Sequence, residues 1–220
     1  MIQRRGITRA LAAAACATLL AVGAPAHAQG QDLDGFFIEV PMGLGTPLAE
    51  DAYETLYDPS FWTGVNLGWL FEVGGGSVAI GPAVDIQYAF GNVEEDWRED
   101  DAREDDLYLG RFRAIGGARF VAAVGDAYIL TRLGLGLDLA HSSWDYYRGG
   151  SNRIQGDHSD LSLGVTAGVG MGYRITELIG VTFLLDLPIG FHDESESSAW
   201  FHWNGELIDL LLSVAVDFYL

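Results

Sequence analysis

The sequence contains no lysine, and arginine supplies all of its 12 basic side chains. Aspartate and glutamate together number 31, so the formal net charge is -19 at pH 7. Such a charge repels phosphate groups, which excludes a nucleic-acid-binding protein. Intrinsic disorder is excluded as well, because 49% of the residues are hydrophobic and 12% are aromatic, enough apolar surface to offset the loss of chain entropy.

Cysteine is nearly absent too, since the only one is Cys16. It lies in a stretch with a basic start, an apolar middle and a final Ala-His-Ala triplet, which predicts a secretory signal peptide over residues 1–28. We expect cleavage after Ala28, which leaves a mature chain at 29–220 without disulfides or thiol chemistry. Lipid attachment to Cys16 is disfavoured, because Ala13 stands where a lipoprotein signal normally has leucine.

Long apolar runs are missing from residue 29 onward. A helix that spans a bilayer needs roughly 18 or more mostly apolar residues in succession. The segment richest in apolar residues, 179–191, is interrupted by Asp186 and Pro188. We therefore expect no membrane-spanning helix.

What the sequence does have is strict alternation of apolar residues with small or polar ones, which is typical of β-strands. One face of each predicted strand is apolar and free of charge, as in the row Leu133, Leu135, Leu137 and Leu139. The alternation predicts eight strands, at about 35–44, 61–73, 77–90, 107–122, 127–143, 160–174, 178–191 and 206–220. The opposite face carries many glycines and the charged residues Glu39, Glu72, Asp85, Arg111, Arg113, Arg119, Arg132, Asp138, Arg174, Asp186, Asp209 and Asp217.

Two closed architectures use such strands, and they place the two faces oppositely. A soluble barrel hides the apolar face and binds an apolar ligand there, whereas a membrane barrel shows it to lipid. Glycine and charge favour the membrane barrel, because a narrow lumen needs small side chains and lets opposite charges neutralise one another. We predict an all-β, eight-stranded antiparallel up-and-down transmembrane β-barrel, with Leu135, Val165 and Leu212 outside and Arg111 and Asp186 inside. The soluble barrel remains the alternative.

The predicted connections alternate between short and long, as in membrane barrels that have short turns at one end. The long ones are predicted at about 45–60, 91–106, 144–159 and 192–205. Aromatic residues near the strand ends predict two interfacial girdles. Trp62, Tyr88, Phe90, Trp144, Phe191, Trp200 and Trp203 lie toward the long connections, and Phe36, Phe71, Phe120, Tyr173 and Phe218 lie toward the short ones.

The signal peptide, the alternating strands and the terminal segment 214–220 together resemble the small eight-stranded outer-membrane β-barrels of Gram-negative bacteria, the family of OmpA, OmpX and OmpW-like proteins. Leu220 is the last residue and Phe218 stands two before it, whereas that family commonly ends in an aromatic residue. The resemblance implies an outer-membrane location and contact with outer-membrane lipid and lipopolysaccharide. It also implies that the insertion machinery reads the last strand. The implied role is structural or surface interaction, without catalysis or a cofactor.

The segment 94–106 holds nine carboxylates in thirteen residues. Divalent cations such as calcium bind carboxylate oxygens, but the segment lacks the ligand spacing and central glycine of an EF-hand. We therefore interpret it as a solvated surface loop without a defined metal site.

His141 and Ser143 have outward parity and resemble the His-x-Ser element of the lipid A deacylase PagL. Trp144 follows where that family has asparagine. We expect no outward-facing carboxylate on the adjacent strand, because Asp160 has inward parity, so the base would lack its orienting acid. A lipid A deacylase using His141 and Ser143 is therefore a second alternative, behind a non-enzymatic barrel whose lumen is plugged by ion pairs.

Overall fold

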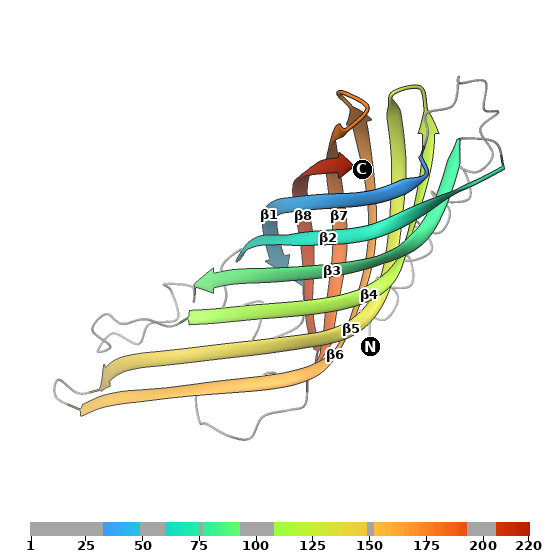
Figure 1. Cartoon of the computed structure of the whole chain (residues 1–220). Helices are drawn as coiled ribbons and strands as arrows, with labels where there is room; N and C mark the ends of the chain where they lie inside the picture. The colour runs from blue at the N-terminus through green and yellow to red at the C-terminus, as the bar shows by residue number, and fades with distance from the viewer. Residues whose placement is uncertain (1–32, 49–59, 75–76, 93–107, 149–151, 193–205) are drawn as a thin grey trace.

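The computed structural model describes residues 33–48, 60–74, 77–92, 108–148, 152–192 and 206–220. Its eight strands close into one antiparallel barrel, in which each strand pairs with its neighbours in the chain and β8 pairs with β1 (Figure 1). The strands are β1 (Gly35–Pro47), β2 (Ser60–Val73), β3 (Val78–Asn92), β4 (Tyr108–Val124), β5 (Ala127–Arg148), β6 (Asn152–Arg174), β7 (Ile179–Phe191) and β8 (Glu206–Tyr219). The predicted fold class is confirmed.

Short turns join β2 to β3, β4 to β5 and β6 to β7, all at the end of the barrel where β8 finishes (Figure 1). Gly125 lies in the shortest of these turns and has a φ of 61°. Glycine adopts this backbone angle without steric strain, whereas residues with a Cβ rarely do. We call this end the turn end and the opposite end the loop end. No helix in the described part of the chain is long and apolar enough to cross a membrane.

One predicted connection is wrong. The segment 144–159 was expected to be a loop, but β5 and β6 continue through most of it and pair as far as Arg148 and Asn152. The two strands therefore form a hairpin that extends beyond the other strands at the loop end (Figure 1). Alternation did not reveal this extension, because residues 144–159 mix aromatic residues with charged residues and glycine and show no long apolar row.

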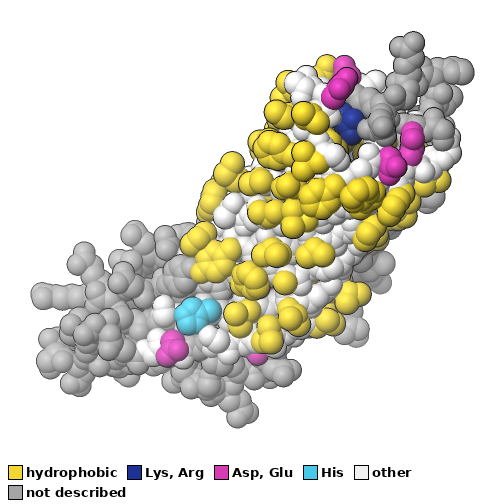
Figure 2. All heavy atoms as spheres, in the orientation of Figure 1, with side chains coloured by type: hydrophobic (Ala, Val, Ile, Leu, Met, Phe, Trp, Pro, Cys, Tyr) yellow, Lys and Arg dark blue, Asp and Glu magenta, His cyan; other side chains and the backbone are white. Residues whose placement is uncertain are grey.

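The apolar face of every strand points out of the barrel. The exposed fraction is 65% for Leu135 and 63% for Leu212, whereas it is 1% for both Arg111 and Asp186. Figure 2 shows the result on one side of the molecule, where hydrophobic side chains cover the middle of the barrel wall and charged ones lie toward its ends. The alternative of a soluble barrel with an apolar interior is therefore wrong.

The height of the apolar belt matches a bilayer. On β5 the belt extends from Ile129 to Leu139, and beyond it the outward positions are His141 and Ser143. At about 3.4 Å per residue and a tilt of about 40°, this stretch is about 26 Å tall, against an apolar band of ~25 Å in membrane barrels.

Two residues depart from the predicted faces and girdles. Trp62, expected among the girdle residues, points into the lumen and is buried. Glu72, expected on the inner face, is exposed to water at the turn end. The other predicted girdle residues with described side chains point outward, namely Tyr88, Phe90 and Phe191 at the loop end and Phe36, Phe71, Phe120, Tyr173 and Phe218 at the turn end. Trp200, Trp203 and the side chain of Trp144 lie outside the described residues.

Candidate functional site

The lumen is filled by three layers of side chains, of which the one nearest the turn end is apolar. This apolar layer consists of Leu33, Phe37, Leu70, Ala79, Val121, Ala123, Tyr128, Leu130, Leu184 and Ala215, all buried. Its members come from the inner faces of seven strands and from the residues before β1. Such a packed layer excludes water from the turn end of the lumen.

The next layer is a turn-side cluster of ion pairs centred on Arg119 and Arg132. Arg132 binds both carboxylate oxygens of Asp186, at 2.7 Å from Nε and 2.6 Å from Nη2. Arg119 Nη1 donates to Glu39 at 2.7 Å, and longer ion pairs join Glu39 and Asp85 to Arg132 at 3.4 Å. These side chains come from β1, β3, β4, β5 and β7, so the cluster cross-links most of the barrel wall.

Asp217 extends the turn-side cluster to β8. Its carboxylate accepts hydrogen bonds from Tyr128, at 2.6 Å, and from Thr182, and forms an ion pair with Arg119. Arg119 also lies over the ring of Phe37, with the guanidinium carbon 4.4 Å from the ring centroid. The ion pairs and the apolar layer therefore pack directly against each other.

A loop-side cluster is centred on Asp138. Arg111 binds both of its oxygens, at 3.0 and 2.7 Å, and Arg113 Nε donates to it at 3.0 Å. Arg111 additionally pairs with Asp209 and donates to the carbonyl of Leu207. The five side-chain donors of a guanidinium suit such branched contacts better than the point charge of an ammonium, which fits the use of arginine alone.

His192 and Trp62 complete the loop-side cluster, and the alternation pattern predicted neither of them there. His192 Nδ1 lies 2.8 Å from Asp160, and its Nε2 lies 3.6 Å from Asp138. Trp62 lies under Arg111 and donates from its indole nitrogen to Ser60 at 2.7 Å. The inward parity of Trp62 was available in the sequence, but its position at a strand end favoured a girdle.

Glycines make room for the ion pairs, as their place on the inner face predicted. A Cβ on Gly168 would lie 1.8 Å from Asp186 Oδ1, and one on Gly190 would lie 2.7 Å from Asp138 Oδ2. No other residue type fits these positions without displacing a carboxylate that holds an arginine.

Five arginines and six carboxylates are buried in the part of the chain that the structure describes. Of the twelve charged residues predicted on the inner face, all but Glu72 are buried there. Arg174, the arginine nearest the turn end, lies over the ring of Tyr219 at 4.0 Å. The clusters and the apolar layer together make the lumen a packed core, so the plugged lumen is what the geometry supports.

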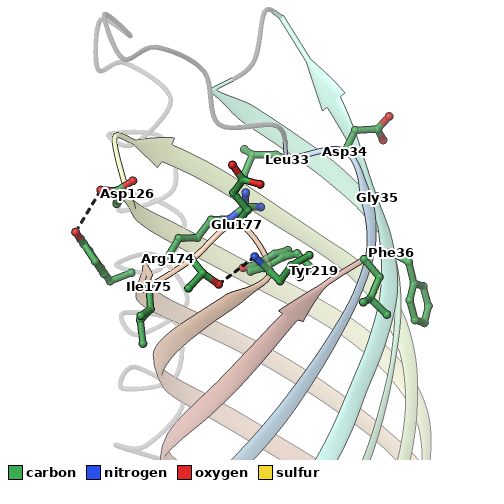
Figure 3. Close-up of a pocket in the computed structure, with 13 residues that line it drawn as sticks. Leu33, Asp34, Gly35, Phe36, Asp126, Arg174, Ile175, Glu177 and Tyr219 are labelled. Carbon is green, nitrogen blue, oxygen red and sulfur yellow. Dashed lines mark hydrogen bonds between the residues drawn. The ribbon is translucent and has the colours of Figure 1, made fainter.

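A pocket of about 600 Å³ opens at the turn end, between the start of β1, the end of β8 and the turn after β6 (Figure 3). In its lining Tyr173 donates a hydrogen bond to Asp126 at 3.2 Å. Leu33 lines the pocket and also belongs to the apolar layer, so the pocket stops at that layer and does not reach the ion pairs.

The outer wall near the loop end holds the residues of the deacylase alternative. His141 Nδ1 is hydrogen-bonded to Ser159 at 2.8 Å, and Ser143 pairs across the strands with Asp157. The expectation that the adjacent strand has no outward carboxylate is wrong, because β6 begins earlier than predicted and includes the exposed Asp157. Asp157 lies opposite the candidate nucleophile rather than the candidate base, so the arrangement is not a catalytic triad.

The signal peptide at 1–28 and the acidic segment 94–106 lie outside the described residues. Within the ranges that are described, no group of histidine, cysteine, aspartate and glutamate side chains could hold a metal ion.

Comparison with protein-family models gives no match, and comparison with curated proteins gives none either. Among solved structures, the chain is similar to neisserial surface protein A (TM-score 0.48, 12% identity, 84% of this chain and 97% of that one). It is also similar to OprG from Pseudomonas aeruginosa (0.44, 9%, 88% and 100%) and to Ail of Yersinia pestis (0.42, 13%, 84% and 99%). At these identities the likeness is one of fold alone.

Proposed function

We propose that this protein is a non-enzymatic barrel of a Gram-negative outer membrane, with a structural or surface-interaction role. The observation that carries the proposal is the inverted distribution of side chains. Leucine, valine and phenylalanine cover the outside, and arginine and aspartate fill the inside, an arrangement that is stable only when hydrocarbon surrounds the wall. A signal peptide at 1–28 that is removed on export, followed by the barrel at 29–220, completes the proposal.

The turn end faces the periplasm in this proposal and the loop end faces the medium. Membrane barrels of this type have short periplasmic turns and longer external connections, and the described chain has its three short turns at one end. The outer face of β8 presents Leu210, Leu212, Val214 and Phe218, which supports recognition of this strand by the insertion machinery. Lipid and lipopolysaccharide are then the partners of the apolar belt.

Extraction from membranes tests the proposal. The full chain, expressed in a Gram-negative host, should stay with the outer-membrane fraction after washing with carbonate and with urea, and should dissolve only in detergent. Folded barrels of this kind resist detergent at room temperature, so the band in an unheated gel should move differently from that in a boiled sample. Recovery of the folded protein in the aqueous wash would overturn the proposal.

A further inference from the structure

A serine, a histidine and an aspartate meet on the inner face of the barrel wall at the loop end. Ser162 Oγ lies 3.2 Å from His192 Nε2, and His192 Nδ1 lies 2.8 Å from Asp160 Oδ2. A nucleophilic serine, its base and the acid that orients the base are joined through these same atoms in serine hydrolases. We call Ser162, His192 and Asp160 the lumen triad.

The register of the barrel explains why the lumen triad forms. Asp160 and Ser162 have the same inward parity on β6. Because β6 pairs with β7 from Leu163 and Phe191 onward, the next residues along, Ser162 and His192, lie opposite each other where β7 ends. Local alternation gives Asp160 its inward parity, but only the closed barrel brings it to a histidine far along the chain.

The groups around His192 leave it able to act as a base. Asp160 accepts from Nδ1 and so favours the tautomer whose proton is on that nitrogen, which directs the lone pair of Nε2 at Ser162. Asp138 lies farther from Nε2, at 3.6 Å, and its carboxylate already accepts hydrogen bonds from two arginines. The hydroxyl of Ser162 also lies 3.3 Å from the backbone carbonyl of Asp138, which keeps it beside the imidazole.

Water reaches the lumen triad from the loop end, whereas lipid does not reach it. Ser162 is half-buried and the side chain of Asp160 is 25% exposed, while that of His192 is fully buried. Leu161 and Leu163, on either side of the serine, point out of the barrel. Because the ion-pair clusters and the apolar layer fill the lumen toward the turn end, an inward side chain at this height meets solvent only through the loop end.

We propose that Ser162 is a nucleophile that takes an acyl group from a small water-soluble ester, with His192 as its base and Asp160 as the residue that positions the base. The serine oxygen attacks the ester carbonyl while its proton passes to Nε2. The bond from the carbonyl carbon to the leaving alkoxide then breaks, and that oxygen takes the proton from the imidazolium. The products are an O-acyl serine and a free alcohol.

This inference goes beyond the proposed function and is compatible with it, because a serine that is acylated once is a modification site and not a catalyst. The surroundings limit the size of the donor. Next to Ser162 the lumen is filled by the loop-side cluster, in which Asp138 and Arg111 are 0% and 1% exposed. A long acyl chain would have to displace these ion pairs or remain in water, so we expect a short acyl group.

A water-soluble fluorophosphonate that carries biotin tests the nucleophile. This class of reagent phosphonylates serines that have an adjacent base and releases fluoride. The purified full chain in detergent micelles should be labelled when folded and unlabelled after boiling. Mass spectrometry should place the label on Ser162 and leave Ser159 unmodified, although Ser159 is exposed and bonded to His141. Ser162→Ala should abolish the labelling, whereas the matched control Ser159→Ala should not change it.

Variants of the other two members separate their roles. His192→Gln removes the base and should slow labelling about 100-fold or more. Asp160→Asn should slow labelling by at least about tenfold, because the amide no longer holds the proton on Nδ1. Asp160→Glu keeps a carboxylate and should retain most of the rate, which a merely structural effect of position 160 would not predict. Gel mobility without heating checks that each variant is folded.

Two esters test the class of donor. Para-nitrophenyl acetate should acetylate Ser162, whereas para-nitrophenyl palmitate in the same micelles should leave it unmodified. Faster acylation by the palmitoyl ester would overturn the proposal, since the donor would then be a lipid. So would an unlabelled wild-type chain, labelling at another serine, or equal rates for the wild type and His192→Gln. These readouts do not depend on membrane location, which the extraction experiment tests separately.

Discussion

At the scale of single residues, the packing of the lumen depends on which inward positions are glycine and so have no side chain. Gly168 faces Asp186 so closely that the carboxylate fills the space a Cβ would take, and that carboxylate holds Arg132 with two hydrogen bonds. Gly116 offers the opposite case, because it lies on the outer face and a Cβ there meets nothing within 4 Å. Gly168 therefore leaves room for an ion pair, whereas Gly116 has open space beside it.

This difference predicts that Gly168→Ala destabilises the barrel and that Gly116→Ala does not. Overpacking at Gly168 should cost about 1–3 kcal/mol, since the Asp186–Arg132 pair must shift. Gly116→Ala should be neutral or stabilising by about 0.5–1 kcal/mol, because alanine loses less conformational freedom than glycine on folding. Urea unfolding in detergent, followed by tryptophan fluorescence, measures both. Equal unfolding midpoints for the two variants would contradict the role assigned to Gly168.

At the scale of the element, each strand has one face suited to lipid and one suited to the lumen. β5 shows both, with a row of leucines outside and Arg132 and Asp138 inside. Toward the loop end the same strand changes outside from Leu139 to His141 and Ser143, where the belt ends. The outward side chains of β5 therefore indicate how deep each position lies in the bilayer.

Arginine substitutions along β5 should follow this depth. Leu135→Arg places a charge near the middle of the belt and should cost about 2–4 kcal/mol, whereas Ser143→Arg at the border should cost about 0–1 kcal/mol. Refolding of purified protein into lipid vesicles, scored by the fraction with folded gel mobility across a urea series, measures the two costs. A Leu135→Arg barrel as stable as Ser143→Arg would show that this face does not meet hydrocarbon.

At the scale of the whole molecule, the barrel wall is held by contacts across the lumen as well as by backbone ladders. The ion pairs join side chains far apart in the sequence, such as Arg111 with Asp209 and Arg119 with Glu39. Replacing one partner would leave a buried charge without compensation, which is more costly than never burying the pair. The apolar layer beneath them closes the turn end.

A lumen packed in this way should not conduct ions. The purified barrel, reconstituted into a planar bilayer at physiological salt, should show no stepwise current above that of the bare bilayer. Steady conductance of the unaltered protein would contradict the plugged lumen, since it requires a continuous water path past Arg119 and Arg132.

Phe37→Ala tests the contribution of the apolar layer. This substitution should lower the free energy of unfolding by about 3–5 kcal/mol, because a cavity remains.

Local pattern determined the strands, their faces and the direction in which each face points. The reason is that strand geometry has a period of two residues, so Leu135 and Asp138 must lie on opposite faces wherever the strand goes. The residue types also favoured a membrane barrel over a soluble barrel that binds an apolar ligand, because glycines and paired charges suit a narrow lumen. The extension of β5 and β6 escaped this reasoning, since residues 144–159 mix aromatic residues with charged residues and glycine and show no long apolar row.

Only the tertiary structure decided which acid meets which arginine. The pairing depends on the register between neighbouring strands and on the closure of β8 against β1, and neither leaves a trace in the local alternation. Closure brings Arg119 near Glu39 and places His192 over Asp138, far from it in the chain. The sequence by itself thus determined what each face is made of, and the closed barrel determined which side chains meet across it.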